Sequence, residues 1–276
     1  MKIGFVSPYD FNKPGGVNRH ISGLADELVN KGHSVKILGI SSKDLKYDTK
    51  AEFVNLGGSF SIGSGGTVAS ISLSPLAFLR MKNILQNVHF DVLHIHEPLI
   101  PVISLGALLL SKSPVVATFH ASSNKTFKYK IIRKMLNHAM TTKINKRIAV
   151  SNEALKTASK YVSGEFDIIP NGIDFDHFSV KRTGSRLNFG EPKKNILFFG
   201  RNEPRKGIPV LLKAFSILRS QNNNVRLILA GPGTDEVNAS EFVKKEYCED
   251  IICVGEIDYS QQPNYFHASD CFCSPA

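Results

Sequence analysis

The fold of this chain is decided by the stretch GRNEPRKG, Gly200 to Gly207, which directly follows the apolar run Ile196–Phe199. The run has the length of a buried strand, the first glycine supplies a turn, and apolar spacing from Ile208 onward predicts a helix. Helix amino ends attract anions, and the three cations of the stretch add fixed positive charge. We therefore predict a strand–turn–helix unit that binds a diphosphate.

A second glycine turn, PGGV at Pro14 to Val17, follows the predicted strand Lys2–Val6. The segment from Gly16 to Lys31 after it has apolar residues at helical spacing, and Gly32 supplies a stop. One strand–turn–helix unit thus begins each half of the chain. This arrangement predicts two lobes that hold a nucleotide-linked substrate.

Short apolar runs alternate with helical patterns along nearly all of the chain. Strands separated by helices imply parallel pairing with right-handed crossovers, so the fold class is α/β. Further strands are predicted at Ser34–Gly39, Val92–His96, Val115–Phe119, Arg147–Val150, Phe166–Ile169, Val225–Leu229, Ile251–Val254 and Cys271–Ser274. Further helices are predicted at Leu76–Gln86, Ile208–Ser220, Asp235–Tyr247 and Gln261–Ala268.

The pattern also predicts where the lobes divide. We expect a first lobe over residues 1–178, a linker over 179–194, and a second lobe over 195–276, because the linker is rich in charge, glycine and proline. Four strands are few for an open α/β sheet, which has about five or six. We therefore expect the second lobe to be incomplete at its carboxyl end.

The composition of the chain indicates which classes of binding partner to expect. The formal charge of +10 and the pI of 9.4 favour a nucleotide diphosphate, an anionic membrane or nucleic acid. The sequence carries no motif typical of RNA or DNA binding, so we disfavour nucleic acid. The cysteines form no Cys-x-x-Cys pair, which favours thiols in a reducing cytoplasm. The longest apolar stretch, Leu99 to Leu110, is too short to span a bilayer. We expect a cytoplasmic protein, soluble or peripheral at the inner face of the membrane.

Polar residues follow several predicted strands at the sheet edge where open α/β folds bind ligands. His94 and His96 share one face of their strand, which allows a metal pair without an evident third ligand, or structural hydrogen bonding. His120 ends the next strand beside a polar turn, and this position favours a functional role. The Gly15–Gly16 turn lacks a Gly-x-Gly-x-x-Gly fingerprint, which disfavours a nicotinamide cofactor.

The segment from Lys125 to Arg147 interleaves basic and apolar residues at helical spacing. A basic amphipathic helix can lie on an anionic membrane. The same pattern fits a helix whose apolar stripe faces the core and whose basic face is solvated. Both interpretations stay open.

These segments together resemble family-4 glycosyltransferases of the GT-B architecture, which has two Rossmann-like lobes with parallel sheets. The resemblance covers nearly the whole chain, and within the family it is closest to the phosphatidylinositol mannosyltransferases that use GDP-mannose. The segments that carry it are 14–17, 90–98, 117–120, 147–151, 169–174 and 199–207.

The resemblance implies retaining transfer of a hexose from a nucleotide sugar to a lipid or glycan acceptor, with no metal or other cofactor. It implies catalytic roles for His120, Arg201 and Lys206. The donor-binding residues that it implies are Gly15, Gly16, Arg205, Asp258 and Tyr259. The acceptor-binding residues that it implies are Tyr9, Asn18 and Lys125.

Four departures qualify the resemblance. Asn18 stands where close relatives have glutamine, and Ser70 stands where they have an arginine. The Leu76–Gln86 helix carries only two cations, whereas theirs is strongly basic. The paired-glutamate segment that the family places after the last strand is expected beyond Ala276. Three hypotheses follow: a mannosyltransferase or a related transferase with another sugar and a non-inositol acceptor, an inactive nucleotide-binding remnant, and, less favoured, a nucleotide-sugar epimerase.

Overall fold

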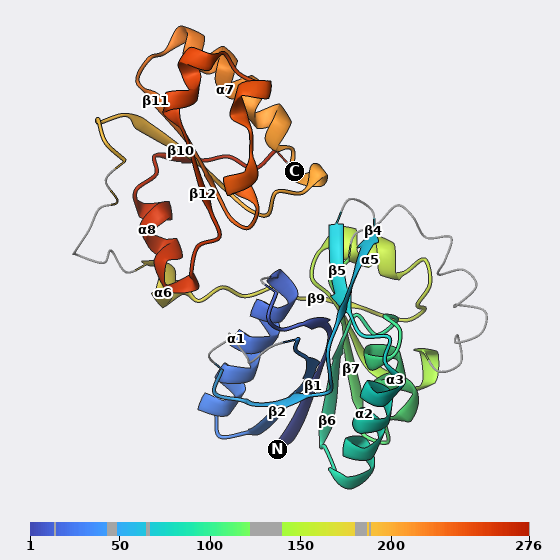
Figure 1. Ribbon diagram of the computed structural model, residues 1–276. Coiled ribbons are helices and arrows are strands. Elements are labelled where there is room, and N and C mark those ends of the chain that lie inside the picture. The colour runs from blue at the N-terminus through green and yellow to red at the C-terminus, as the bar shows by residue number, and fades with distance from the viewer. Residues whose placement is uncertain are drawn as a thin grey trace. The chain divides into compact units, whose positions relative to one another are not determined.

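The computed structural model describes residues 1–13, 15–42, 49–64, 67–121, 140–179, 187 and 189–275. The chain divides into two compact units, Met1–Ile173 and Asp174–Ala276 (Figure 1). The division falls a few residues before the boundary at 178 that the sequence predicts. Much of the predicted linker, 180–186 and 188, lies outside the described residues.

Unit 1 is built on a parallel sheet with the strand order β3-β2-β1-β6-β7-β8-β9. Its strands are β1 (Lys2–Asp10), β2 (Ser34–Ile40), β3 (Glu52–Asn55), β6 (Val92–His96), β7 (Val115–Phe119), β8 (Ile144–Ala149) and β9 (Asp167–Ile168). A hairpin of β4 (Phe60–Ser64) and β5 (Thr67–Ile71) pairs antiparallel with the end of β1. Because the main strands are parallel, their carboxyl ends share one edge of the sheet.

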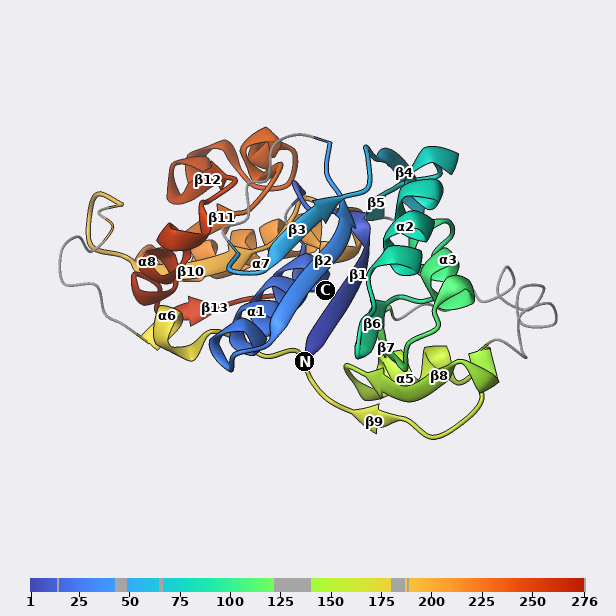
Figure 2. The same ribbon diagram turned by 90° about the horizontal axis from the view of Figure 1, so that it is seen from below.

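Helices cover both faces of this sheet (Figures 1 and 2). Successive side chains of β1 point to opposite faces of the sheet. Phe5 packs in the core under α1 (Gly16–Asn30), while Val6 packs in the core under α2 (Pro75–Asn87) and α3 (Ile103–Leu110). The apolar period that predicts α1 therefore corresponds to its buried face. A further helix, α5 (Asn152–Ala158), follows β8, and the Ser151 hydroxyl caps its amino end by accepting the Ala154 N–H.

Unit 2 repeats the architecture on a smaller parallel sheet with the order β12-β11-β10-β13. Its strands are β10 (Lys194–Phe199), β11 (Val225–Ala230), β12 (Ile251–Gly255) and β13 (Cys271–Phe272). The helix α7 (Ile208–Gln221) packs on one face and α8 (Gln262–His267) on the other. A short helix, α6 (Phe175–Ser179), begins the unit.

The predicted helix over Asp235–Tyr247 is wrong. The segment forms three short 3-10 turns, η2 (Thr234–Glu236), η3 (Ala239–Glu241) and η4 (Lys245–Asp250). The residues before η3 and η4, Asn238 and Lys244, have extended backbone that interrupts any helix. Val237 after η2, Val243 between η3 and η4, and Tyr247 within η4 all pack in or against the core, so packing is satisfied without a continuous helix.

The predicted basic helix over Lys125–Arg147 lies largely outside the described residues, which exclude 122–139. Its last residues are not helical, because β8 already begins at Ile144. The strand forms there because Ile144 and Arg147 pair with Val115 and Ala117 of β7.

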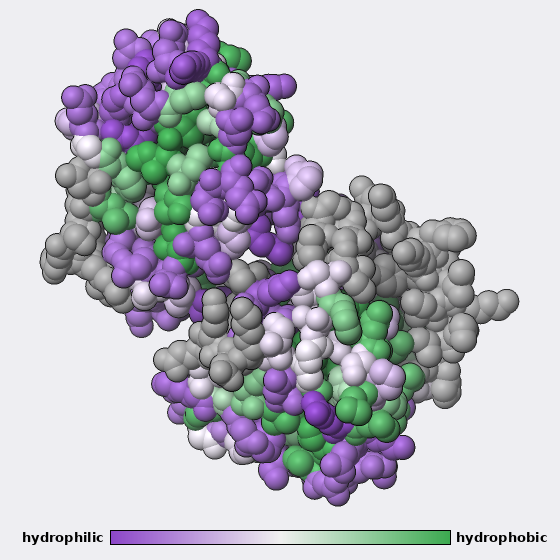
Figure 3. All heavy atoms as spheres, viewed as in Figure 1, coloured by the Kyte–Doolittle hydropathy of each residue, from purple (hydrophilic) through white to green (hydrophobic). Residues whose placement is uncertain are grey.

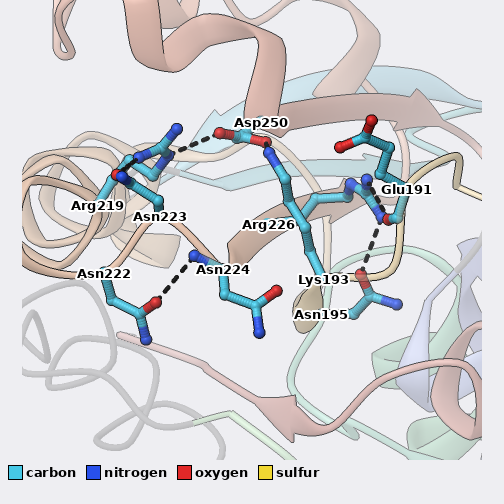
Figure 4. A network of polar contacts seen from close by, with 9 residues as sticks. All are labelled: Glu191, Lys193, Asn195, Arg219, Asn222, Asn223, Asn224, Arg226 and Asp250. Carbon is cyan, nitrogen blue, oxygen red and sulfur yellow. Dashed lines mark hydrogen bonds and ion pairs between the residues drawn. The ribbon is translucent and has the colours of Figure 1, made fainter.

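The amino-terminal edge of the unit 2 sheet carries a network of charges (Figure 4). Asp250 is only 2% exposed, and its carboxylate makes ion pairs with Lys193 and, at 2.6 Å, with Nε of Arg219. Arg226 lies in the same network and donates to the backbone oxygen of Glu191 at 3.0 Å. Burial acts to raise the pKa of Asp250, but the hydrogen bonds and charges of Lys193 and Arg219 outweigh it and hold this pKa below its usual range.

Candidate active site

Four histidines gather at the carboxyl edge of the unit 1 sheet. His94 and His96 of β6 stack with ring centroids 4.5 Å apart, and His96 stacks on His120 at 5.2 Å. His20 of α1 lies edge-on to His96 and His120 at 5.6 and 5.5 Å. The stack arises because the parallel register places His96 beside Thr118, two residues before His120.

Hydrogen bonds order the stack. His96 Nδ1 lies 2.9 Å from His120 Nε2, and His94 Nε2 lies 2.7 Å from the hydroxyl of Thr118. Burial, assisted by repulsion from neighbouring imidazoles, lowers the pKa of both His94 and His120 to about 3 and that of His96 well below its usual range. These rings are therefore neutral near pH 7, and each has one nitrogen that is able to donate a hydrogen bond and one that is able to accept one. Within the described part of the chain, no group of three or more His, Cys, Asp or Glu residues could hold a metal ion.

Glu97 completes this edge and has no role in the sequence-based predictions. Its buried carboxylate oxygen Oε1 accepts the backbone N–H groups of His120 at 2.5 Å and Ala121 at 2.7 Å. Burial raises the pKa of Glu97, although these two hydrogen bonds act against the rise. Its φ of 49° is the left-handed conformation that side chains other than glycine rarely adopt.

Hydrogen bonds from the buried side chain of Asn18 stabilise the turn between β1 and α1. Asn18 is 2% exposed, its amide donates to the Asp10 carbonyl at 2.8 Å, and its Oδ1 accepts the Ser7 hydroxyl at 3.0 Å. Its predicted acceptor contact therefore competes with these internal bonds. Gly15 is extended, with φ of −171°, and a Cβ on Gly16 would meet no atom within 4 Å. Protein packing thus does not require a glycine at position 16, and the turn has open space beside it.

The other predicted acceptor-binding residues belong to unit 1, and two predicted donor-binding residues belong to unit 2. Tyr9 is partly buried at the end of β1, and Lys125 lies outside the described residues. In unit 2, Asp258 precedes the 3-10 turn η5 (Tyr259–Gln261), and one face of the Tyr259 ring stacks on His177 at 4.0 Å. His177 also donates from Nε2 to the Tyr259 carbonyl at 3.0 Å, so this face is already covered.

The cationic loop of unit 2 is organised around a carboxylate. Glu203 is 9% exposed, and its carboxylate pairs with Arg201 at 3.2 Å and with Arg205 at 3.0 Å. Lys206 follows in the same turn; burial lowers its pKa, repulsion from Arg205 and Arg201 adds to the decrease, and Glu203 acts against it. The structure thus brings together the three predicted cations. It also places Glu203 between Arg201 and Arg205, a role that the sequence does not predict.

The loops after β10, β11 and β12 pack backbone against backbone. Gly231 has φ of +122°, and a Cβ there would lie 2.3 Å from the Gly200 carbonyl oxygen. The buried hydroxyl of Thr234 lies 2.9 Å from the Gly231 carbonyl and accepts the Gly255 N–H at 3.0 Å. Sequence reasoning missed this network because its members are far apart along the chain.

Gly231→Ala is expected to destabilise the protein by more than about 2 kcal/mol, because the methyl group overlaps the Gly200 backbone and the residue must keep a positive φ. Thermal unfolding should show a midpoint lower by several degrees. The matched control is Gly23→Ala in α1, where a Cβ meets nothing within 4 Å and alanine favours the helix. Equal melting of Gly231→Ala and wild type would contradict this account of the loop.

Comparison with known proteins decides the family. Residues 14–177 match the model of Glycosyltransferase Family 4, and residues 181–276 match that of Glycosyl transferases group 1. The chain belongs to glycosyltransferase family 4. This glycosyltransferase is 33% identical over 276 residues to the phosphatidyl-myo-inositol mannosyltransferase of Mycobacterium leprae, covering 100% of this chain and 72% of the relative. It is 34% identical to that of Propionibacterium freudenreichii, covering 100% and 71%.

Solved structures confirm the predicted GT-B fold. This glycosyltransferase matches WaaG, a glycosyltransferase involved in lipopolysaccharide biosynthesis, with a TM-score of 0.68 at 18% identity over 99% of this chain and 75% of that one. It matches Anabaena HepE in complex with UDP-glucose with a TM-score of 0.63 at 16% identity, over 99% and 73%. The predicted enzyme class is also confirmed. Across the described residues, no helix has the length and apolar character needed to cross a membrane.

Proposed function

We propose that this glycosyltransferase transfers mannose from GDP-mannose to a phosphatidylinositol-type lipid, with retention of configuration. The observation that carries the proposal is the loop with Arg201, Arg205 and Lys206 at the carboxyl edge of the unit 2 sheet, where open α/β folds bind ligands. The identity to phosphatidyl-myo-inositol mannosyltransferases supports the choice of sugar and acceptor.

The proposed donor chemistry is electrostatic. Arg201 and Lys206 would stabilise the negative charge that grows on the departing diphosphate, and Arg205 would bind the donor. Glu203 holds two of these cations in place before any ligand arrives, so little reorganisation is needed. Because burial and neighbouring cations lower the pKa of Lys206, an incoming dianion relieves local repulsion.

The other roles follow the family resemblance. The open space at Gly16, beside Gly15, suits close approach of a donor phosphate. Asp258 and Tyr259 are proposed to contact the nucleoside from the turn at the start of η5. His120 is proposed to contact the transferred sugar; its neutral ring can exchange one hydrogen bond with a hydroxyl without adding charge.

We also propose peripheral attachment at the inner face of the membrane. Leu73 before α2 and Leu76 and Leu79 in its first two turns are each about half exposed, and Arg80 and Lys82 follow on the same helix. Figure 3 shows hydrophobic residues on the side of unit 1 that carries α2 and α3, mixed with polar ones. Exposed leucines next to cations suit the interface of an anionic membrane, and the net charge of +10 adds attraction.

One observation favours a non-inositol acceptor as the second candidate. Ser70 is 5% exposed, and its hydroxyl lies 3.2 Å from that of Ser61. The position therefore supplies no positive charge to an inositol phosphate. Under this alternative the same donor loop serves another nucleotide sugar and a different lipid or glycan.

Radiolabelled transfer tests the proposal. The protein is incubated with GDP-[14C]mannose and vesicles of phosphatidylinositol or of phosphatidylglycerol, and UDP-[14C]glucose serves as the competing donor. We expect labelled lipid from GDP-mannose and phosphatidylinositol alone, and a decrease of about 100-fold or more in Lys206→Ala. Lys213→Ala, an exposed cation of α7, should transfer normally. Transfer from UDP-glucose, or equal labelling of phosphatidylglycerol, would favour the second candidate, and no labelled lipid from GDP-mannose and phosphatidylinositol would contradict the proposal.

A further inference from the structure

We propose that His96 and Glu97 are positioning residues for His120: His96 fixes the plane and tautomer of its ring, and Glu97 fixes its backbone. Both residues end β6, and His120 follows the neighbouring strand β7. The inference rests on the proposed function only in assigning His120 to the sugar. Beyond that role, the contacts of His96 and Glu97 hold the His120 ring in one tautomer and one orientation.

The first argument is the hydrogen bond between the rings. His96 Nδ1 and His120 Nε2 lie 2.9 Å apart, and because both rings are neutral one of these nitrogens carries the proton and the other accepts it. The remaining nitrogens, His96 Nε2 and His120 Nδ1, are buried and have no partner within the part of the chain that the structure describes. The tautomer of His96 therefore determines whether Nδ1 of His120 donates or accepts.

The second argument is the rigidity of His96. Its side chain is completely buried, it stacks on His94 at 4.5 Å, and His94 is in turn held by the Thr118 hydroxyl at 2.7 Å. The hydroxyl of Ser104 donates to the His96 carbonyl at 2.8 Å and fixes its backbone. Because these contacts restrict movement of the His96 ring, the ring can hold His120 in one orientation. A site residue must be held in this way to keep a precise geometry.

The third argument is the backbone contact of Glu97. The ladder of β7 ends at Phe119, so the N–H groups of His120 and Ala121 need a partner beyond the sheet, and the Glu97 carboxylate accepts both. Glu97 reaches them from a φ of 49°, while its own N–H still donates to the Thr118 carbonyl at 2.9 Å. Strained backbone of this kind persists where the surroundings hold it, commonly at functional sites.

The ring contact is tested by long-range 1H–15N correlation spectra of the histidine-labelled protein near neutral pH. In the wild type, we expect His120 to show one protonated and one bare nitrogen. His96→Asn places an amide near the position of Nδ1 and should keep this pattern. His96→Gln places its amide near Nε2, and His96→Phe keeps only an aromatic ring. Both should give averaged signals for His120. Thermal melts identify any variant that fails to fold. If His96→Phe does not fold, the comparison of His96→Asn with His96→Gln is sufficient for the test.

The backbone contact is tested by hydrogen exchange at the amides of His120 and Ala121. Glu97→Ala should accelerate exchange at both by about tenfold or more, because hydrogen bonds to charged groups are stronger than those between neutral groups and alanine supplies no acceptor. Glu97→Gln keeps an accepting oxygen and should stay close to wild type.

A single unchanged tautomer of His120 in a folded His96→Gln or His96→Phe variant would overturn the inference, as would wild-type exchange in Glu97→Ala. Neither readout needs a sugar donor. Adding GDP-mannose to the labelled wild type separates the two proposals: if no resonance moves, the proposed donor fails, while the positioning of His120 is still judged on its own data.

Discussion

Asp250→Ala is expected to lower the free energy of unfolding of unit 2 by about 3–5 kcal/mol. The carboxylate is 2% exposed and neutralises Lys193 and Arg219, whose side chains are 18% and 12% exposed. Removing it leaves two poorly solvated cations close together without a counter-charge. Denaturant unfolding followed by circular dichroism measures the change. The matched control is Glu246→Ala, which breaks an ion pair with Lys244 in which both side chains are 68% exposed, and should cost less than about 1 kcal/mol. A cost of this small size for Asp250→Ala would show that the network in Figure 4 contributes little.

Mild acid is expected to have a comparably large effect, because unfolding returns His94, His96 and His120 to their ordinary pKa of 6.5. Folding lowers the pKa of His94 and His120 to about 3, so between those values the unfolded chain binds more protons than the folded one. Stability must then rise with pH across this window and decrease as pH falls below 6.5. With about three protons taken up on unfolding near pH 5, the slope is on the order of 4 kcal/mol per pH unit.

Denaturant midpoints measured from about pH 7.5 to 4.5 test this slope. His89→Gln, which removes an exposed histidine, should leave the profile unchanged. The contribution of Asp250 belongs to a different window, because its lowered pKa affects stability only around and below its ordinary value of 3.8. A stability that does not change between pH 7 and 5 would mean that the histidine stack is hydrated and titrates normally.

The sequence predicts most of the architecture because the buried strands are short runs of mainly apolar residues. The predicted ranges of β6 and β7 agree with the structure at both ends, since each run is bounded by polar or turn residues. The sequence pattern does not predict the strand β3 or the hairpin of β4 and β5. They are short, and β3 is only partly buried, so its sequence lacks the apolar contrast that identifies a strand.

The site is predictable only in part. Strand ends point to His120 and to the cationic loop, because ligands bind at that edge of parallel sheets. Sequence patterns assign no role to Glu97, Glu203 and Thr234, since each acts through contacts that depend on how distant segments of the chain pair. The bond from His96 to His120 joins residues 24 apart, and only the pairing of β6 with β7 brings them together.

The central claim, that the loop of unit 2 binds the donor diphosphate, is tested most directly by isothermal titration of the protein with GDP-mannose and UDP-glucose. We expect GDP-mannose to bind selectively, and Arg201→Ala to weaken this binding at least about tenfold, since a hydrogen bond to a charged group is worth about 1.5–3 kcal/mol. Lys213→Ala should bind as wild type does. Absence of binding by either nucleotide sugar, or equal affinity of the wild type and Arg201→Ala, would contradict the claim.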